Sequence, residues 1–132
     1  MLIVNSGHDI HHVTDKGYVE APVRIPVILE ELEKTDLFTR VKAEKFPVKF
    51  IKQVHDHGYV DYFRRACESL PEGKSIYPII FPLRNTLRPP KDPELQIGYY
   101  CMDTFTPFNK NAYLAARGAV DCALTDRCRQ NS

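Results

Sequence analysis

The distribution of proline is the strongest constraint on how this chain can fold. Seven of the ten prolines lie between residues 71 and 107. Each proline fixes its own φ angle and lacks an amide donor, so this segment cannot be one continuous helix or strand. The segment also carries five aromatic side chains, which argues against a disordered linker. We therefore predict a long aromatic and proline-rich loop over 71–107, and such loops usually serve function or bind partners.

Regular elements are expected before this loop. Residues 2–4 are a short apolar run typical of a first strand. A first helix is predicted from Pro22 to about residue 34, with a helical turn over 48–54. A further helix is expected to be capped by Asp56. Its apolar stripe has the spacing of one helical face and consists of Tyr59, Phe63, Ala66, Cys67 and Leu70.

The last helix is expected to start after Pro107, with Thr106 or Asn109 as its cap, and to run to about Leu124. Its buried face should be mostly small and consists of Ala112, Ala115, Ala116, Ala119, Val120 and Ala123. The residues that follow, 125–132, form an atypical tail that abandons the pattern. One strand, three main helices and the long loop indicate an α/β chain that is too short for a large doubly wound sheet.

Charge and hydropathy exclude several classes of protein. The chain has 18 Lys and Arg against 17 Asp and Glu, a net charge of +1, which argues against a general nucleic-acid binder. No apolar stretch approaches the roughly 20 residues needed to span a membrane, and the start is too quickly polar for a signal peptide. We expect a cytoplasmic domain, residues 1–132, with reduced cysteines and with neither nucleic-acid nor membrane partners.

Histidine offers the first candidates for chemistry. A loop contains His8, Asp9, His11 and His12, which could bind a transition metal and make the chain a small independent metallohydrolase. No helical spacing fixes a ligand geometry there, so lining a loop or a substrate entrance is the favoured interpretation. His55 and the aspartate after it match the two-residue signature of metal-dependent phosphohydrolases, but the other ligands are missing. Bracing the next helix explains that pair better.

One acidic and one basic residue, Glu20 and Arg24, lie near the start of the first predicted helix. Arg24 lies in the first turn, where the helix dipole does not favour it. It can reach across to a carboxylate or to backbone carbonyls, or it can simply be solvated. Glu20 suits the positive end of the helix. The chain has no GxSxG, P-loop or GxGxxG motif, so residue chemistry alone indicates no reaction.

The order of several segments resembles one family. The segments are His11-His12, Glu20-x-Pro22-x-Arg24, Val54-His55-Asp56-x-x-Tyr59-Val60, Phe81-Pro82-x-Arg84 and Gln96-Ile97-Gly98-Tyr99-Tyr100-Cys101-x-Asp103-x-x-Thr106-Pro107. In this order and spacing they resemble the N-terminal part of bacterial acetylpolyamine amidohydrolases, which belong to the zinc-dependent histone deacetylase superfamily. The resemblance extends over almost the whole chain.

The resemblance implies an incomplete arginase- and deacetylase-like three-layer α/β fold. It also implies hydrolysis of acetyl amides of polyamines or of acetyl-lysine-like small substrates by a zinc-bound water. The family takes its zinc ligands from an Asp-x-His motif and a later Asp, and its tandem histidines from Pro-Gly-His-His. The resemblance places both motifs after the segments matched here, and the pair at 11–12 lacks the Pro-Gly context. We therefore expect no catalytic residue, no metal held by this chain alone, and an inactive N-terminal fragment.

The resemblance assigns lesser roles to other residues. The candidates for the substrate channel or a dimer interface are Tyr99, Tyr100, Cys101, Asp103, Phe81 and Arg84. The residues of the structural motif are His11, His12, Glu20, Pro22, Arg24, His55, Asp56 and Tyr59. The alternative function is a non-catalytic binding or dimerisation module that uses the 71–107 loop. Because the helix stripes would be partly bare without further strands, we also predict marginal stability or a homo-oligomer.

Overall fold

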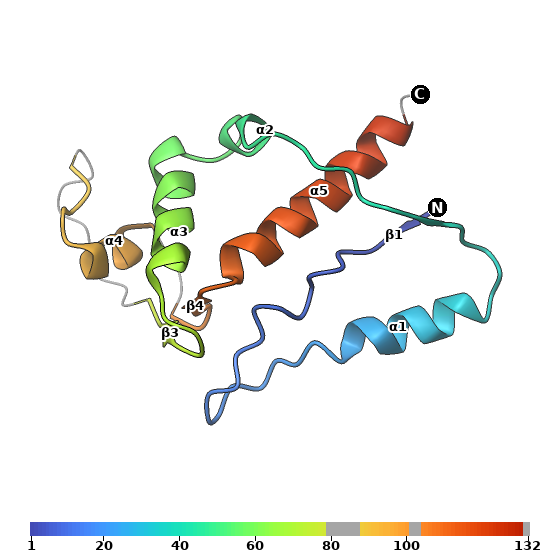
Figure 1. The fold of residues 1–132 in the computed structure, drawn as a ribbon, viewed down its shortest axis with the longest axis horizontal. Helices are drawn as coiled ribbons and strands as arrows, with labels where there is room; N and C mark the ends of the chain where they lie inside the picture. Colours follow the sequence, from blue (N-terminus) through green and yellow to red (C-terminus); the bar gives the residue numbers. More distant parts are fainter. Residues whose placement is uncertain (79–87, 101–103, 131–132) are drawn as a thin grey trace.

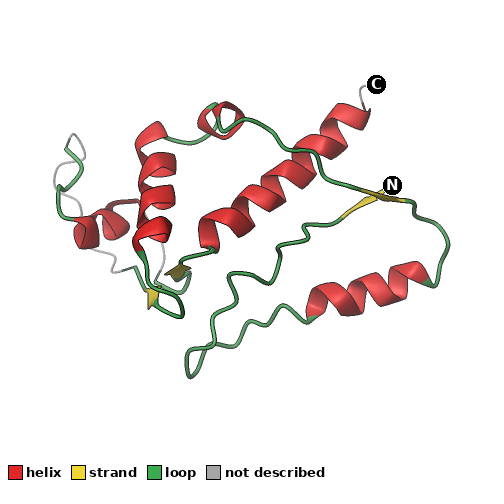
Figure 2. Ribbon diagram, in the orientation of Figure 1, coloured by secondary structure: helices red, strands yellow, loops and turns green. Residues whose placement is uncertain are grey.

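The computed structural model describes residues 1–78, 88–100 and 104–130 (Figure 1). The elements of this part are β1 Leu2–Ile3, α1 Arg24–Glu33, β2 Arg40–Val41, α2 Lys49–Lys52, α3 His57–Ser69, β3 Ser75–Ile76, α4 Pro93–Tyr100, β4 Phe108–Asn109 and α5 Ala112–Gln130. The chain is therefore a mixed α/β structure dominated by helices (Figure 2). None of the described helices is both long enough and apolar enough to cross a membrane.

The strands form two small separate sheets. β1 pairs in parallel with β2, and β3 pairs antiparallel with β4. The facing residues are Leu2 with Arg40, Ile3 with Val41, Ser75 with Asn109 and Ile76 with Phe108. The strand predicted at the start of the chain is confirmed. The other three strands were not predicted, because two-residue strands are too short to show a hydrophobic period.

The packed part of the molecule is built around α3. Asp56 caps this helix as predicted, since its Oδ1 accepts a hydrogen bond of 2.8 Å from the backbone N–H of Tyr59. The buried cluster joins Tyr62 of α3 to Ile97 of α4 and Phe108 of β4. Partly buried side chains packed against it are Phe63, Ala66, Leu70, Ile76 and Tyr100. The predicted stripe is thus the middle of a wider buried arc, flanked on either side by Val60 and Tyr62.

The 71–107 segment holds more regular structure than the sequence predicts. Its described part contains β3 and α4, and Tyr99 and Tyr100 form the last turn of that helix rather than a loop. The density of prolines predicted a loop here, but Pro93 occupies the first position of α4, where the absent N–H would have no partner within the helix. Residues 79–87 and 101–103 lie outside the described residues.

α5 is longer than predicted, and the tail 125–132 is not atypical over its described part. The helix continues to Gln130, and the buried contact that it makes over these residues is polar. Thr125 is fully buried, and its hydroxyl donates a hydrogen bond of 2.7 Å to the carbonyl of Asp121. The same hydroxyl accepts a bond of 2.8 Å from the N–H of Glu44. A hydrophobic pattern cannot reveal a helix face that is buried through polar groups.

Only part of the small-residue face predicted for α5 is buried. Ala112 and Ala115 are covered, and Val120 is half-buried. The alanines that remain exposed are Ala116, Ala119 and Ala123. The prediction that this helix is partly bare is therefore confirmed.

Buried Asp121 fixes the segment between β2 and α2 onto α5. Its Oδ1 accepts a hydrogen bond of 3.1 Å from the N–H of Phe46, and its Oδ2 lies 3.2 Å from Nζ of Lys45. Arg117, one turn earlier on α5, donates a bond of 2.6 Å to the carbonyl of Phe46. These contacts explain how a carboxylate that is only 1% exposed is tolerated, because a buried charge must be paired.

Gly118 lets the N-terminal segment approach the same helix closely. The Nδ2 of Asn5 donates a hydrogen bond of 2.9 Å to the carbonyl of Ala115. A Cβ atom added at Gly118 would overlap the Oδ1 of Asn5. The glycine thus positions the loop that carries three of the histidines.

α1 is the least packed helix. It begins at Arg24, slightly later than predicted, and has no side-chain N-cap. Its half-buried residues are Ile25, Leu29 and Leu32, whereas Val23, Val27 and Ile28 are 61%, 53% and 50% exposed. The wide apolar face predicted for this helix is therefore covered on one side only.

We predict that Asp121→Ala lowers the free energy of unfolding by about 2–3 kcal/mol, because it removes the partner of the partly buried Phe46 N–H and of Arg117. Urea denaturation measures the change. The matched control is Asp126→Ala on the same helix, whose exposed bond to Gln130 should contribute less than about 0.5 kcal/mol. Equal effects of the two substitutions would contradict this account of α5.

Candidate functional site

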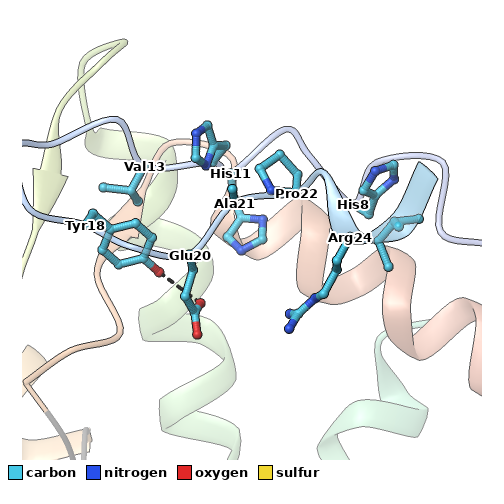
Figure 3. A pocket seen from close by; sticks show the side chains of 10 residues that line it. His8, His11, Val13, Tyr18, Glu20, Ala21, Pro22 and Arg24 are labelled. Carbon is cyan, nitrogen blue, oxygen red and sulfur yellow. Dashed lines mark hydrogen bonds between the residues drawn. The ribbon is translucent and has the colours of Figure 1, made fainter. Parts of the chain in front are cut away.

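A pocket lies between the N-terminal loop and the start of α1 (Figure 3). Its volume is about 160 Å³, and its lining residues are His8, His11, His12, Val13, Tyr18, Glu20, Ala21, Pro22, Arg24 and Ile25. We call it the histidine pocket. It brings together the whole first half of the structural motif predicted from the sequence, namely His11, His12, Glu20, Pro22 and Arg24.

Polar contacts within the histidine pocket are few. The hydroxyl of Tyr18 donates a hydrogen bond of 3.3 Å to Oε2 of Glu20 (Figure 3). Burial, with a smaller effect of the Glu20 carboxylate, raises the pKa of the Tyr18 hydroxyl. Nδ1 of His8 donates a bond of 3.1 Å to the carbonyl of Asn5. The pocket therefore offers imidazole, carboxylate and guanidinium groups on an otherwise apolar wall.

Arg24 adopts the solvated alternative. The side chain is exposed at the first position of α1. Within residues 1–78, 88–100 and 104–130, no carboxylate lies at ion-pair distance from its guanidinium. Its charge is thus available to a ligand or to another molecule.

Two asparagines before α5 hold the histidine loop in place. Asn109 donates a hydrogen bond of 2.8 Å to the carbonyl of His11, and Asn111 donates one of 2.9 Å to the carbonyl of Ile10. On the far side of the loop, the hydroxyl of Tyr77 donates a bond of 2.9 Å to Asp15. Sequence reasoning missed these anchors, because contacts between residues about a hundred positions apart leave no local signal.

A second cavity adjoins the histidine pocket. Its volume is about 420 Å³, and its lining residues are Asn5, His8, His11, Tyr59, Phe63, Thr106, Pro107, Phe108, Ala112, Ala115, Ala116 and Ala119. We call it the aromatic groove. His8 and His11 line both cavities, so the two lie side by side at the histidine loop. A mostly apolar hollow of this size with a few polar groups is typical of sites for small molecules.

The second half of the structural motif meets the channel candidates of α4 beside this groove. The ring of Tyr59 lies 6.1 Å from that of His55 and 5.7 Å from that of Tyr100, measured between ring centroids. Tyr99 packs edge-on against Tyr100 at 4.9 Å. The structure therefore brings together residues that the sequence assigns to two separate motifs.

Tyr100 lies close to the N-terminus of α3. A Cβ atom at Gly58 would come within 2.7 Å of the Tyr100 hydroxyl, so a side chain at this position would require Tyr100 to shift. Burial, with a smaller effect of the Asp56 carboxylate, raises the pKa of the Tyr100 hydroxyl. Four other candidates, Phe81, Arg84, Cys101 and Asp103, lie outside the described residues.

The described residues do not form a metal centre. Among them, no group of three or more His, Cys, Asp or Glu side chains is placed to hold a metal ion. Among these described residues, His8, Asp9, His11 and His12 are not gathered as a ligand set of three or more side chains. The zinc implied by the family resemblance likewise finds no matching donor set in this part of the chain.

Comparison with known proteins gives one informative relative. No protein-family model matches the chain. The chain is 30% identical over 110 residues to an acetylpolyamine amidohydrolase from Mycoplana ramosa. The match covers 80% of this chain but 32% of the relative, so the chain spans about a third of that protein's length. This similarity agrees with the resemblance in motif order and supports a deacetylase-like family.

Cys67 is a poor candidate for a nucleophile. Burial raises the pKa of its thiol to about 11, so the reactive thiolate is scarce near neutral pH. We predict that iodoacetamide at pH 8.5 alkylates Cys67 at least about a hundredfold more slowly than exposed Cys128. Mass spectrometry of tryptic peptides measures both alkylation rates. In urea, where the protein is unfolded, the two rates should become similar. Alkylation of Cys67 as fast as Cys128 in the folded protein would contradict the assignment.

Proposed function

We propose that this chain forms the N-terminal portion of a deacetylase-like amide hydrolase related to the acetylpolyamine amidohydrolases, with an arginase-like α/β fold. The observation that carries the proposal is the 30% identity over 110 residues to the Mycoplana ramosa enzyme. The convergence of separate motif residues on two adjoining cavities supports it. The mixed α/β architecture and the parallel pairing of β1 with β2 are compatible with such a fold.

The proposed substrates are acetylated polyamines or acetyl-lysine-like small molecules. Both present a slender methylene chain that can lie along an apolar wall. The aromatic groove offers such a wall through Tyr59, Phe63 and Phe108, with the histidine pocket at one end. We propose that these residues line the approach of the substrate, and that Tyr99 and Tyr100 order the groove by packing against α3.

The chemistry of the reaction is proposed to come from residues that this chain does not supply. When bound, zinc in such enzymes polarises the amide carbonyl and lowers the pKa of its bound water. The described residues lack the donor set for that ion. We therefore propose that this chain alone is inactive. Separately, we propose the cytoplasmic location predicted from the sequence.

The purified chain tests this proposal directly. With zinc in the buffer we expect no stoichiometric metal by elemental analysis after dialysis, and no hydrolysis of acetylputrescine or acetyl-lysine peptides. The complete acetylpolyamine amidohydrolase from Mycoplana ramosa serves as the positive control. One zinc per chain together with multiple turnovers would contradict the proposed inactivity.

A further inference from the structure

Basic side chains gather where the segment between β2 and α2 crosses the C-terminal half of α5 (Figure 1). We call residues 40–53 together with residues 125–130 of α5 the basic strip. Its basic side chains are Arg40, Lys42, Lys45, Lys49, Lys52, Arg127 and Arg129. None of them lines the histidine pocket or the aromatic groove, so the strip is a surface separate from the candidate site.

The small net charge of the whole chain conceals this strip. Seven basic residues stand in it against two acidic ones, Glu44 and Asp126, which gives the strip a net charge of +5. All other residues together then carry −4, because the chain as a whole carries +1. Such an uneven distribution of charge favours an anionic partner on one face, and the total charge cannot reveal it.

Three lysines of the strip are exposed to solvent. No carboxylate lies at ion-pair distance from Lys42 or Lys49 among residues 1–78, 88–100 and 104–130. Lys45 lies 3.2 Å from Oδ2 of buried Asp121, but the lysine side chain itself is 83% exposed. These three ammonium groups can therefore meet another molecule without first leaving a buried position.

Other basic side chains of the strip are paired with acidic neighbours. The pairs are Arg40 with Glu33, Lys52 with Asp61 and Arg129 with Glu44. The two arginine pairs are exposed and contribute little to stability, whereas Lys52 is only 23% exposed. Because the carboxylates offset part of the positive charge, the attraction of an anionic partner depends mainly on the three exposed lysines.

Apolar side chains emerge between and beside these lysines. Val48 and Phe50 are 37% and 36% exposed, and Val54, directly after the strip, is 79% exposed. Lysines next to exposed apolar side chains are typical of segments that lie at the boundary between lipid headgroups and acyl chains. An anionic lipid surface attracts the lysines, and shallow burial of the apolar side chains adds to the binding.

Other anionic partners fit the same residues less well. Nζ of Lys49 lies over the ring of Phe50, 5.4 Å from its centroid, and Phe46 packs against this ring at 6.0 Å, so little of it is left to stack on a base. Lysine also lacks the bidentate geometry with which arginine binds bases and phosphates. Protein interfaces are depleted in lysine, so coverage of the strip by further protein is disfavoured as well.

We propose that the basic strip is a docking surface for membranes that contain anionic phospholipids. Lys42, Lys45 and Lys49 lie next to the headgroups, and Phe50 and Val54 reach the upper part of the acyl chains. The docking is independent of the proposed hydrolase function. It replaces the expectation of no membrane partner, which followed from the lack of a spanning segment and did not consider the charge of one face.

Flotation of the purified chain with lipid vesicles tests this docking. Each lysine near an anionic surface strengthens partitioning by about fivefold, so the three exposed lysines together give about a hundredfold. We expect this ratio between vesicles with about 30% phosphatidylserine and vesicles of phosphatidylcholine alone, at about 50 mM salt. Raising the salt to about 300 mM should weaken binding by about tenfold, because salt screens the attraction.

Two variants separate the contributions of charge and apolar contact. Lys42→Glu combined with Lys49→Glu should weaken binding to the anionic vesicles by about twentyfold or more. Val54→Ser should weaken it by about threefold and leave its salt dependence unchanged. All three side chains are exposed, so circular dichroism should show the wild-type fold and melting curve.

The matched control is Lys16→Glu combined with Lys74→Glu, which changes the net charge equally. Both residues are exposed, in the loop before α1 and in the turn before β3, away from α2 (Figure 1). This variant should bind like the wild type within about twofold. An equal loss in the control would mean that net charge alone governs binding, and it would overturn the assignment to the strip.

Three further outcomes would overturn the proposal. The first is a wild-type chain that does not float with the anionic vesicles. The second is equal binding to vesicles of phosphatidylcholine alone, which would exclude a role of the lysines. The third is displacement of the vesicle-bound chain by a single-stranded oligonucleotide at an equal concentration of phosphate groups, which would assign the strip to nucleic acid instead.

Discussion

The aromatic face of α3 is the contact on which the rest of the structure depends. Phe63 packs against Phe108 of β4 at 4.6 Å between ring centroids and against Tyr113 of α5 at 5.8 Å. Tyr62 stacks on Tyr100 of α4 at 5.2 Å. Because three elements meet on one helix, this face sets the position of the aromatic groove. Aromatic pairs of this kind contribute about 0.5–1.5 kcal/mol each beyond the area that they bury.

The N-terminal half depends on polar contacts instead. Asparagine side chains fix the histidine loop, and the carboxylate of Asp121 fixes the segment before α2. Such contacts orient the chain: a typical hydrogen bond contributes about 1 kcal/mol net, whereas removing one partner and leaving the other buried and unsatisfied costs more. This division explains why α1 keeps an exposed apolar face while α3 is well covered.

The sequence predicts the elements whose signals are local. α3 follows from the Asp56 cap and a 3.6-residue apolar period, and both are confirmed. The sequence does not predict α4, because proline is common both in loops and in the first turn of a helix. The sequence does not predict the C-terminal end of α5, because Thr125 is buried through hydrogen bonds, which hydropathy cannot show. The motif order names residues in separate segments, and only tertiary contacts reveal that several of them line two cavities that share His8 and His11.

The central proposal is that this chain forms the N-terminal portion of a deacetylase-like amide hydrolase. The 30% identity over 110 residues to the Mycoplana ramosa relative supports it. Sequencing the genomic DNA beyond codon 132 and translating it in all frames tests this claim most directly. The account predicts a Pro-Gly-His-His segment followed by an Asp-x-His motif. Their absence from every frame would contradict it and favour a free-standing binding module.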